Sequence, residues 1–485
     1  MPRVFDFVRQ GNKYVYEPNV MMASAPKLTT VEGKQTVTYE ISEDAVWSDN
    51  EPITSTDFKY SWDQIATGED IYDASGYNKI ESVDDTDPKV AVVTFSEPYA
   101  PWRALFGGSL YGILPSHLLE GKDRSAEMAN GYSFSGGPYI ATWEKGVGVT
   151  LDANPNWYGE PVKTDHIVFK FLPDTAAQFQ AFKAGEVDAI YPQPQPDVIE
   201  QIKAGIPDAN SYFTAQTVNA EALWINNEAF PFDSVKVRQA LGYAVDRDVV
   251  VKRLFGDLGV NKALNTLNPP VNAAFADTEA FAKYTLNLKK VNSLMTSDGW
   301  EKNADGVWEK DGEPADIVIQ STEGNQRRAL TEEILQELLA TAGFNLTIEN
   351  HSAGDLFGQN LPAGDYQVGL YAQVATQIEP GNCPVFCSDN IPTDANGNVG
   401  QNWTRTDLPG LDPLLRKVDA SSDPAVVAKN NKKADKIEAR YATSIPLDPL
   451  PNIALWSKSI KGIDPKHPDN PFFAMFFNLA EWSKA

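Results

Sequence analysis

The sequence predicts an α/β protein with more than one domain, and three observations lead to this prediction. The chain has 485 residues, which exceeds the size at which a single hydrophobic core stops growing. It is 42% hydrophobic and 22% charged, a composition typical of globular proteins. Segments with strand-like and helix-like patterns alternate along the chain, which favours a layered α/β architecture.

The first clear elements are a strand and a helix. Residues 35–48 alternate apolar and polar side chains, as a strand that leads into a turn does. A helix follows, for which Thr54 or Ser55 is the expected N-cap. Apolar residues recur there at helical spacing, so we expect this helix to turn inward its residues Phe58, Trp62 and Ile65.

The middle of the chain continues the alternation. Residues 136–153 predict two short strands joined by a turn, and residues 166–171 predict another strand. An amphipathic helix from residue 174 onward buries Phe179 and Phe182 and ends at Gly185.

The second half also alternates strands and helices. A strand near Trp224 leads into a helix whose inward face carries Val237, Leu241, Ala244 and Val245. Residues 330–350 predict a helix, a glycine stop and a strand, and residues 423–456 predict a helix followed by a proline-bounded strand. No flexible linker separates these units, so we expect the chain to cross between domains through strands.

The segment NPNWYGEP, residues 154–161, places two large aromatic side chains among turn-forming residues. We interpret Trp157 and Tyr158 as anchors that pin a connection to a sheet, because each can bury a large area. Four further tryptophans lie in strand or helix patterns and are predicted to pack in the core: Trp47, Trp62, Trp143 and Trp224.

The charge excludes some classes of partner. The chain has 66 acidic and 41 basic residues, a net charge of -25, which repels nucleic acid and anionic membrane surfaces. No run approaches the roughly 18 apolar residues that cross a bilayer, and the N-terminal residues lack the apolar region of a signal peptide.

Sequence motifs for catalysis, metal binding and phosphate binding are missing. We find no G-x-S-x-G, H-E-x-x-H or glycine-rich phosphate loop, and we expect no cofactor and no metal. Asp394, Asn396 and Asn398 have the spacing of a calcium loop, but Val399 and Arg405 replace its glycine and its bidentate glutamate. A cleft hydrolase with a carboxylate pair remains an alternative, because the chain is so rich in acidic residues.

Cys383 and Cys387 are the two cysteines of the chain. Their spacing allows a local disulfide in an oxidising compartment or two free buried thiols. A structural zinc site needs four ligands, and the histidines lie far apart in the sequence.

Four segments, in this order and spacing, resemble the solute-binding proteins of family 5, which serve ABC importers of oligopeptides, dipeptides and nickel. The segments are VTYEISEDAVWSDNEPITSTDFKYSW (37–62), SGGPYIATWEKGVGVTLDANPNWYGEP (135–161), FLPDTAAQFQAFKAGEVDAIY (171–191) and INNEAFPFDSVKVRQALGYAVDRDVV (225–250). The C-terminal NPFFAMFFNLAEW is similar to the closing segment of actinobacterial members.

The resemblance implies a two-lobed α/β fold like that of periplasmic binding proteins (type II, cluster C), with a hinge between the lobes and an additional α/β domain. The expected division is the additional domain at 1–105, lobe 1 at 106–218 and 457–485, and lobe 2 at 219–456. An N-terminal strand of lobe 1, a segment that lines the cleft, and a leader with a lipid anchor are expected to be missing from the sequence.

One departure from the family concerns the ligand. Oligopeptide binders of the family carry an aspartate that pairs with the free ammonium of the peptide. The segment GDYQVGLYAQVATQIEP places Thr376 at that position and Gln373 where a cleft tryptophan is expected. Either the ligand has no free amino terminus, or another carboxylate such as Asp365 or Glu379 serves.

The resemblance predicts a monomeric binding protein without enzymatic activity, attached outside the cell membrane. It captures a peptide or peptide-like solute and hands it to the membrane permease of an ABC importer; an oligosaccharide or another neutral polar solute is the alternative ligand. The predicted ligand-binding residues are Tyr371, Gln373, Thr376, Gln377, Asn402 and Trp403.

Overall fold

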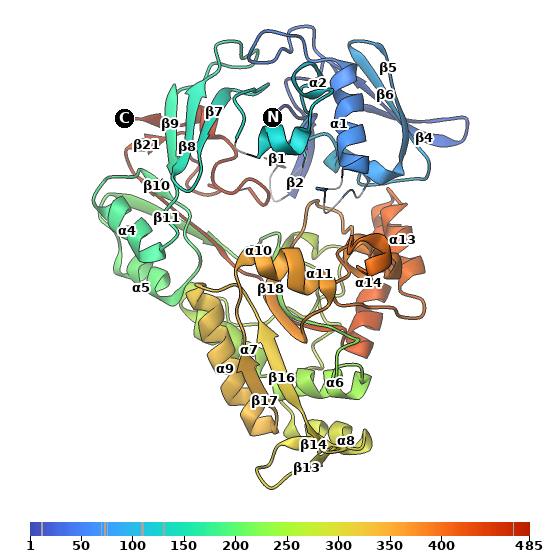
Figure 1. The fold of residues 1–485 in the computed structure, drawn as a ribbon. Helices are drawn as coiled ribbons and strands as arrows, with labels where there is room; N and C mark the ends of the chain where they lie inside the picture. The colour runs from blue at the N-terminus through green and yellow to red at the C-terminus, as the bar shows by residue number, and fades with distance from the viewer. Residues whose placement is uncertain are drawn as a thin grey trace.

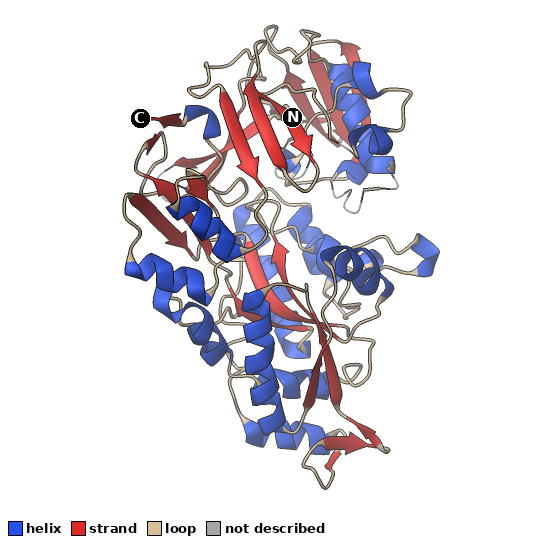
Figure 2. Ribbon diagram, turned by 60° about the vertical axis from the view of Figure 1, so that its left-hand side comes forward, coloured by secondary structure: helices blue, strands red, loops and turns tan. Residues whose placement is uncertain are grey.

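The chain forms two lobes, one above the other in Figure 1. The computed structural model describes residues 1–10, 13–68, 70–71, 74, 76–107, 111–129, 131–468 and 470–485. We define the first lobe as the described residues of 1–214 and 452–485, and the second lobe as residues 219–448. Figure 2 shows helices and strands in both lobes.

A four-stranded antiparallel sheet with the order β3-β4-β6-β5 forms one side of the first lobe. Its strands are β3 (Lys27–Val31), β4 (Lys34–Glu40), β5 (Ile80–Asp87) and β6 (Val90–Phe95). Helix α1 (Ser55–Thr67) packs on β5 and β6. Thr54, one of the two predicted residues, is the N-cap of α1, and its backbone amide donates to the Asp57 carboxylate at 3.0 Å.

The first lobe also contains smaller sheets and short helices. The sheets are the hairpin of β1 (Phe5–Gln10) and β2 (Lys13–Pro18), the sheet of β7 (Tyr139–Glu144), β8 (Gly148–Ala153) and β9 (His166–Lys170), and the pair β21 (Ile460–Lys461) and β22 (Ser483–Lys484). Two of the short helices are α2 (Ser116–Leu119) and α3 (Arg124–Met128). Trp143 on β7 is 36% exposed, so its prediction as a core residue is wrong. Burial along β7 decreases from Tyr139 at its start to the exposed residues 142–144 at its end.

The 154–161 segment anchors a connection in the first lobe. The Tyr158 hydroxyl donates to the Gly136 carbonyl at 3.0 Å, and the ring packs against the core of this lobe. The side-chain amide of Asn156 donates to the Ser48 backbone carbonyl at 2.9 Å. Tyr158 therefore has the predicted anchoring role, whereas the Trp157 indole donates to the Glu160 carbonyl within the same turn at 2.9 Å.

A three-stranded sheet, β10 (Ala189–Ile190), β20 (Asn452–Ser457) and β11 (Ala209–Thr214), lies beside the junction of the lobes (Figure 1). Side chains of β20 alternate between its two faces. Ile453 and Leu455 join a core that α4 (Thr175–Lys183) and α5 (Pro196–Ala204) share with the sheet and helices of the second lobe. Trp456 faces the opposite side and packs with Met475 and Trp482 of the C-terminal segment.

The second lobe contains a mixed five-stranded sheet with the order β17-β16-β18-β12-β19. The strands are β12 (Asn219–Ile225), β16 (Asp316–Gln320), β17 (Asn345–Ile348), β18 (Val368–Val374) and β19 (Ser444–Asp448). β16 runs parallel to β17 and β18, whereas β12 is antiparallel to β18 and β19. Side chains of β12 are almost all buried, because this strand lies inside the sheet with both faces covered.

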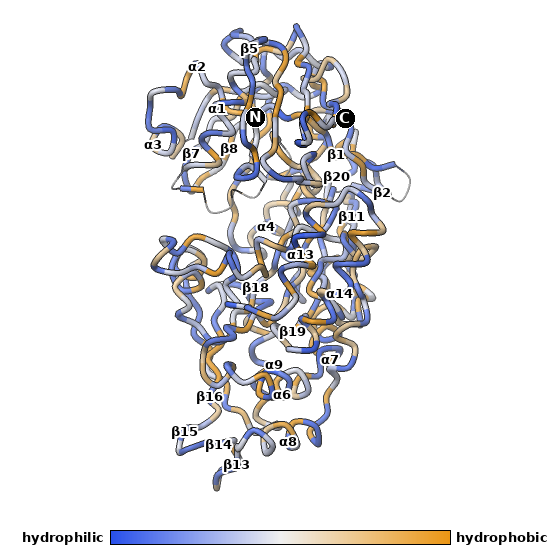
Figure 3. The backbone as a smooth tube through the Cα atoms, turned by 90° about the vertical axis from the view of Figure 1, so that its right-hand side faces the viewer, coloured by the Kyte–Doolittle hydropathy of each residue, from blue (hydrophilic) through white to orange (hydrophobic). Residues whose placement is uncertain are grey.

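Helices surround this sheet (Figure 2). They are α6 (Val235–Ala244), α7 (Arg247–Phe255), α8 (Leu288–Ser297), α9 (Gln326–Ala342), α10 (Ala353–Asp355), α11 (Leu361–Ala363), α12 (Cys383–Phe386), α13 (Asp412–Asp419) and α14 (Pro424–Tyr441). The strands β13 (Glu301–Lys302), β14 (Trp308–Lys310) and β15 (Glu313–Pro314) form a hydrophilic tip (Figure 3). Among the described residues, no helix has both the length and the apolar character that a bilayer crossing needs.

Two short segments carry the chain between the lobes. Residues 215–218 connect β11 to β12, and residues 449–451 connect β19 to β20. The two segments are tied together, because the Thr217 hydroxyl donates to the Pro449 carbonyl at 2.6 Å. We propose these segments as the hinge, and therefore a domain boundary at residues 449–451 rather than at the expected residue 457.

Candidate ligand-binding site

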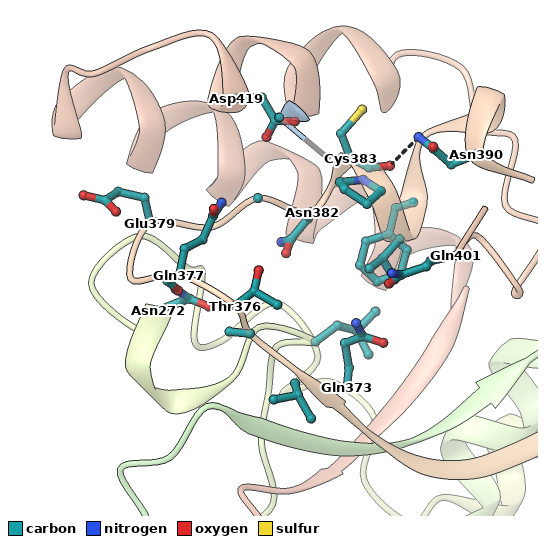
Figure 4. A pocket seen from close by; sticks show the side chains of 18 of the residues that line it. Asn272, Gln373, Thr376, Gln377, Glu379, Asn382, Cys383, Asn390, Gln401 and Asp419 are labelled. Atoms are coloured by element: carbon teal, nitrogen blue, oxygen red, sulfur yellow. Dashed lines mark hydrogen bonds between the residues drawn. The ribbon is translucent and has the colours of Figure 1, made fainter. Parts of the chain in front are cut away.

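A cavity of about 470 Å³ lies between the two lobes. The first lobe contributes its residues Gly76, Asn78, Lys79, Glu97 and Tyr99. The second lobe contributes the end of β18 with its following loop, the α12 segment, and part of α13. Figure 4 shows many of these side chains around the space. A solute bound here contacts both lobes, so binding and the approach of the lobes are coupled.

Aromatic packing positions the end of β18 at the cavity. The Tyr371 ring stacks on Trp224 with centroids 5.5 Å apart and meets Trp403 edge-on at 5.8 Å. The Trp224 indole donates to the Tyr371 carbonyl at 2.8 Å, which fixes the strand. Burial raises the pKa of the Tyr371 hydroxyl well above its ordinary value of 10.0, so this hydroxyl stays protonated at neutral pH.

The loop after β18 is held on both sides. The Ala375 amide donates to the Val218 carbonyl of the proposed hinge at 2.8 Å. The side-chain amide of Asn272 donates to the Gln377 carbonyl at 3.4 Å and to the Ile378 carbonyl. These bonds place Thr376 and Gln377 in the cavity wall. Movement of the hinge segment therefore also moves the loop.

The segment around α12, residues 381–390, forms a further wall of the cavity, and we call it the α12 segment. Cys383 and Cys387 are joined by a disulfide across α12. The side-chain amide of Asn390 donates to the Cys383 backbone carbonyl at 3.1 Å (Figure 4). The side-chain amide of Asn382 donates to the side-chain oxygen of Asn268 at 2.7 Å. Cys383, Cys387 and Asp389 are the group in the described residues with metal-ligand spacing. The disulfide uses both sulfur atoms, so this group does not fit a metal.

Five of the six predicted ligand-binding residues line this cavity, and Asn402 does not: the lining residues are Tyr371, Gln373, Thr376, Gln377 and Trp403. Asn402 is 0% exposed. Its side-chain amide donates to the Cys387 carbonyl at 3.1 Å and to the Thr406 carbonyl at 2.8 Å. Asn402 therefore supports the α12 segment from behind.

Among the described residues of the cavity wall, carboxylates outnumber cations. The acidic residues of this set are Glu97, Glu379, Asp389 and Asp419, and the basic residues are Lys79 and Arg416. Lys79 pairs with Glu97 at 3.4 Å and Arg416 pairs with Asp389 at 2.7 Å. Burial raises the pKa of Asp419 to about 7, and nearby Lys79 and Arg416 oppose this rise.

Sequence reasoning named six of the residues that line the cavity, namely Tyr371, Gln373, Thr376, Gln377, Glu379 and Trp403, and did not assign the others to the site. The missed polar residues include Asn78, Lys79, Glu97, Asn272, Asn382, Arg416 and Asp419. No local pattern marks them, because only the folded chain brings 76–99 to 371–419. Of the two alternative carboxylates, Glu379 lines the cavity and Asp365 does not.

Known proteins resemble this chain in both sequence and fold. The family model described as bacterial extracellular solute-binding proteins, family 5 Middle, matches residues 19–387. The oligopeptide-binding protein OppA of Mycobacterium tuberculosis is 24% identical over 435 residues, which cover 86% of this chain and 69% of OppA.

Two solved structures show the similarity in three dimensions. The periplasmic EDTA-binding protein EppA is 25% identical, with a TM-score of 0.84 over 100% of this chain and 90% of EppA. The oligopeptide-binding protein AppA of Bacillus subtilis, solved with a nonapeptide, is 18% identical, with a TM-score of 0.84 over 100% of this chain and 92% of AppA. The predicted two-lobed α/β fold is confirmed by these matches.

Proposed function

The chain belongs to the bacterial extracellular solute-binding proteins of family 5, and on this premise we propose that it captures a peptide or peptide-like solute between its lobes. It delivers this solute to the membrane permease of an ABC importer. The observation that carries the proposal is the cavity of about 470 Å³ whose walls come from both lobes, a volume in the range of small-molecule sites.

The lining supports recognition by hydrogen bonds. The side chains of Gln373, Gln377, Asn382 and Gln401 surround the cavity with amide donors and acceptors, which match the peptide groups of an extended ligand. The same amides, together with Trp403, suit a neutral oligosaccharide, which we keep as the second candidate ligand. The proposed activity is binding without turnover. We propose that the protein acts as a monomer on the outer side of the cell membrane, to which it is attached.

Two measurements test the proposal. Native mass spectrometry of protein purified from its own host identifies a co-purified solute. A thermal-shift screen then compares di- to nonapeptides with oligosaccharides, because a ligand at 100 times its Kd adds about 2.7 kcal/mol to the unfolding free energy. Stabilisation by peptides supports the proposal, whereas stabilisation by oligosaccharides alone, or turnover of the solute, contradicts it.

A matched pair of variants ties the shift to the cavity. We expect Gln373→Ala to reduce the ligand-induced rise in melting temperature, because Gln373 lines the cavity. Gln359→Ala is the control, because Gln359 is exposed and outside the cavity wall. Equal shifts in both variants would place the ligand elsewhere.

A further inference from the structure

The α13 end of the cavity holds a buried carboxylate, one oxygen of which has no hydrogen-bonding partner among the described residues. Asp419 is 5% exposed and ends α13. Its Oδ1 atom makes no hydrogen bond within the described part of the chain. Figure 4 places this carboxyl across the cavity from Gln373. A buried carboxylate in this state costs free energy unless a cation or a proton reaches it.

The cations near Asp419 already have other carboxylate partners. Lys79 comes from the first lobe and pairs with Glu97, and Arg416 is on α13 and pairs with Asp389. Their charges act on Asp419 from a distance and lower its pKa, whereas burial and Glu97 raise it. No basic side chain forms an ion pair with Asp419 among the described residues, so the position beside its carboxyl is open to a ligand cation.

The rest of the wall favours the same class of ligand. With all groups ionised, the described residues of the wall supply four carboxylates and two cations, an excess of negative charge. An anionic group here meets like charge, whereas an ammonium or guanidinium group meets an attraction that is strongest at Asp419, because this carboxyl is buried. The neutral amides near Gln373 then remain available for the uncharged part of the ligand.

Resting on the proposed function, we propose that Asp419 receives a cationic group of the ligand, an ammonium or a guanidinium, at the α13 end of the cavity. The first lobe covers this position, because the Ala100 amide donates to the Asp419 carbonyl oxygen at 2.8 Å. A ligand cation offsets the cost of burying the Asp419 charge. Cation recognition and closure of the lobes are thereby linked.

The first experiment uses three pools of random pentapeptides: unmodified, N-acetylated, and unmodified but without lysine and arginine. Binding is measured by native mass spectrometry for the wild type, Asp419→Asn, and the control Asp407→Asn, which changes an exposed carboxylate outside the cavity wall. We expect Asp419→Asn to lower affinity for cationic peptides at least tenfold and Asp407→Asn to leave it unchanged. Loss on acetylation assigns the terminal ammonium, and loss without lysine and arginine assigns a side-chain cation.

A second readout does not depend on peptides. In protein labelled with carbon-13 aspartate, the Asp419 carboxyl signal is assigned by its loss in Asp419→Asn and titrated with pH. We expect pentylamine at millimolar concentration to lower the titration midpoint and the neutral 1-pentanol to leave it unchanged.

The outcomes separate the two proposals. If peptides bind equally well to wild type and Asp419→Asn and pentylamine does not move the midpoint, the cation site is overturned while the proposed function stands. If no peptide pool binds but pentylamine moves the midpoint, the peptide function fails and the cation site stands. If no pool binds and the midpoint is unmoved, both proposals fail.

Discussion

The amide of Ala100 in the first lobe donates a 2.8 Å hydrogen bond to the carbonyl oxygen of Asp419 in the second lobe. Ala100 follows Tyr99, which lines the cavity as Asp419 does. A single hydrogen bond contributes about 1 kcal/mol net, which is less than a bound ligand supplies at high saturation. We therefore expect the ligand, and not this contact, to decide how closely the lobes approach.

Spin labels on the two lobes test this expectation. Lys122→Cys in the first lobe and Lys432→Cys in the second provide exposed attachment points. Without ligand, we expect a population with a longer distance between the labels, which a stabilising peptide pool converts to the shorter distance. Identical distance distributions with and without the pool would contradict closure by the ligand.

Glu221 lies between two arginines in the core of the second lobe. Its carboxylate is 0% exposed and contacts Arg327 and Arg328, each at 2.9 Å. Glu221→Gln removes the carboxylate that both buried arginines contact, so we expect the unfolding free energy to fall by about 3–5 kcal/mol. Urea unfolding measures the change.

The matched control is another glutamate–arginine pair, in which the carboxylate is exposed. Glu228 lies 3.8 Å from Arg405, and its side chain is 63% exposed. Solvent screens such a pair, so Glu228→Gln should cost less than about 1 kcal/mol. Similar losses in the two variants would show that burial does not set the strength of these ion pairs.

Asp419 also predicts a pH dependence of stability. Burial raises its pKa from 3.8 to about 7 in the folded chain, so the folded state holds a proton that the unfolded state releases between these values. Its contribution to stability is complete below pH 4 and is lost as the pH rises through 7. We expect Asp419→Asn to match the wild type at pH 4 and to exceed it at pH 8 by up to roughly 4 kcal/mol in unfolding free energy. Parallel pH profiles for the two proteins would refute this assignment.

The disulfide predicts a joint effect on stability and binding. Cys383 and Cys387 are four residues apart, and constraining so short a loop stabilises by about 2 kcal/mol in the chain-entropy estimate. The double substitution Cys383→Ser with Cys387→Ser should lower the unfolding free energy by this amount. It should also weaken ligand binding, because residues 382–386 line the cavity. Treatment of the wild type with dithiothreitol should reproduce both effects, and unchanged binding would show that α12 holds its place without the bond.

Local patterns in the sequence predicted the elements well where chain neighbours decide the outcome. The capping of α1 by Thr54, the burial of Phe58 and Ile65 and the end of α9 at Gly343 are confirmed. The prediction that Trp143 packs in the core was wrong. A strand pattern shows which residues share a face, but it does not show whether another layer covers that face.

For the site, the sequence by itself indicated the end of β18 and the neutral residues Gln373 and Thr376, because the segment GDYQVGLYAQVATQIEP resembles the cleft strand of the family. Only the tertiary structure placed Lys79 and Glu97 opposite Asp419 and put Asn402 behind the wall. Hydrophobic periodicity specifies how each element buries its own apolar face. The meeting of two separate lobes depends on contacts between residues hundreds of positions apart, which no local pattern records.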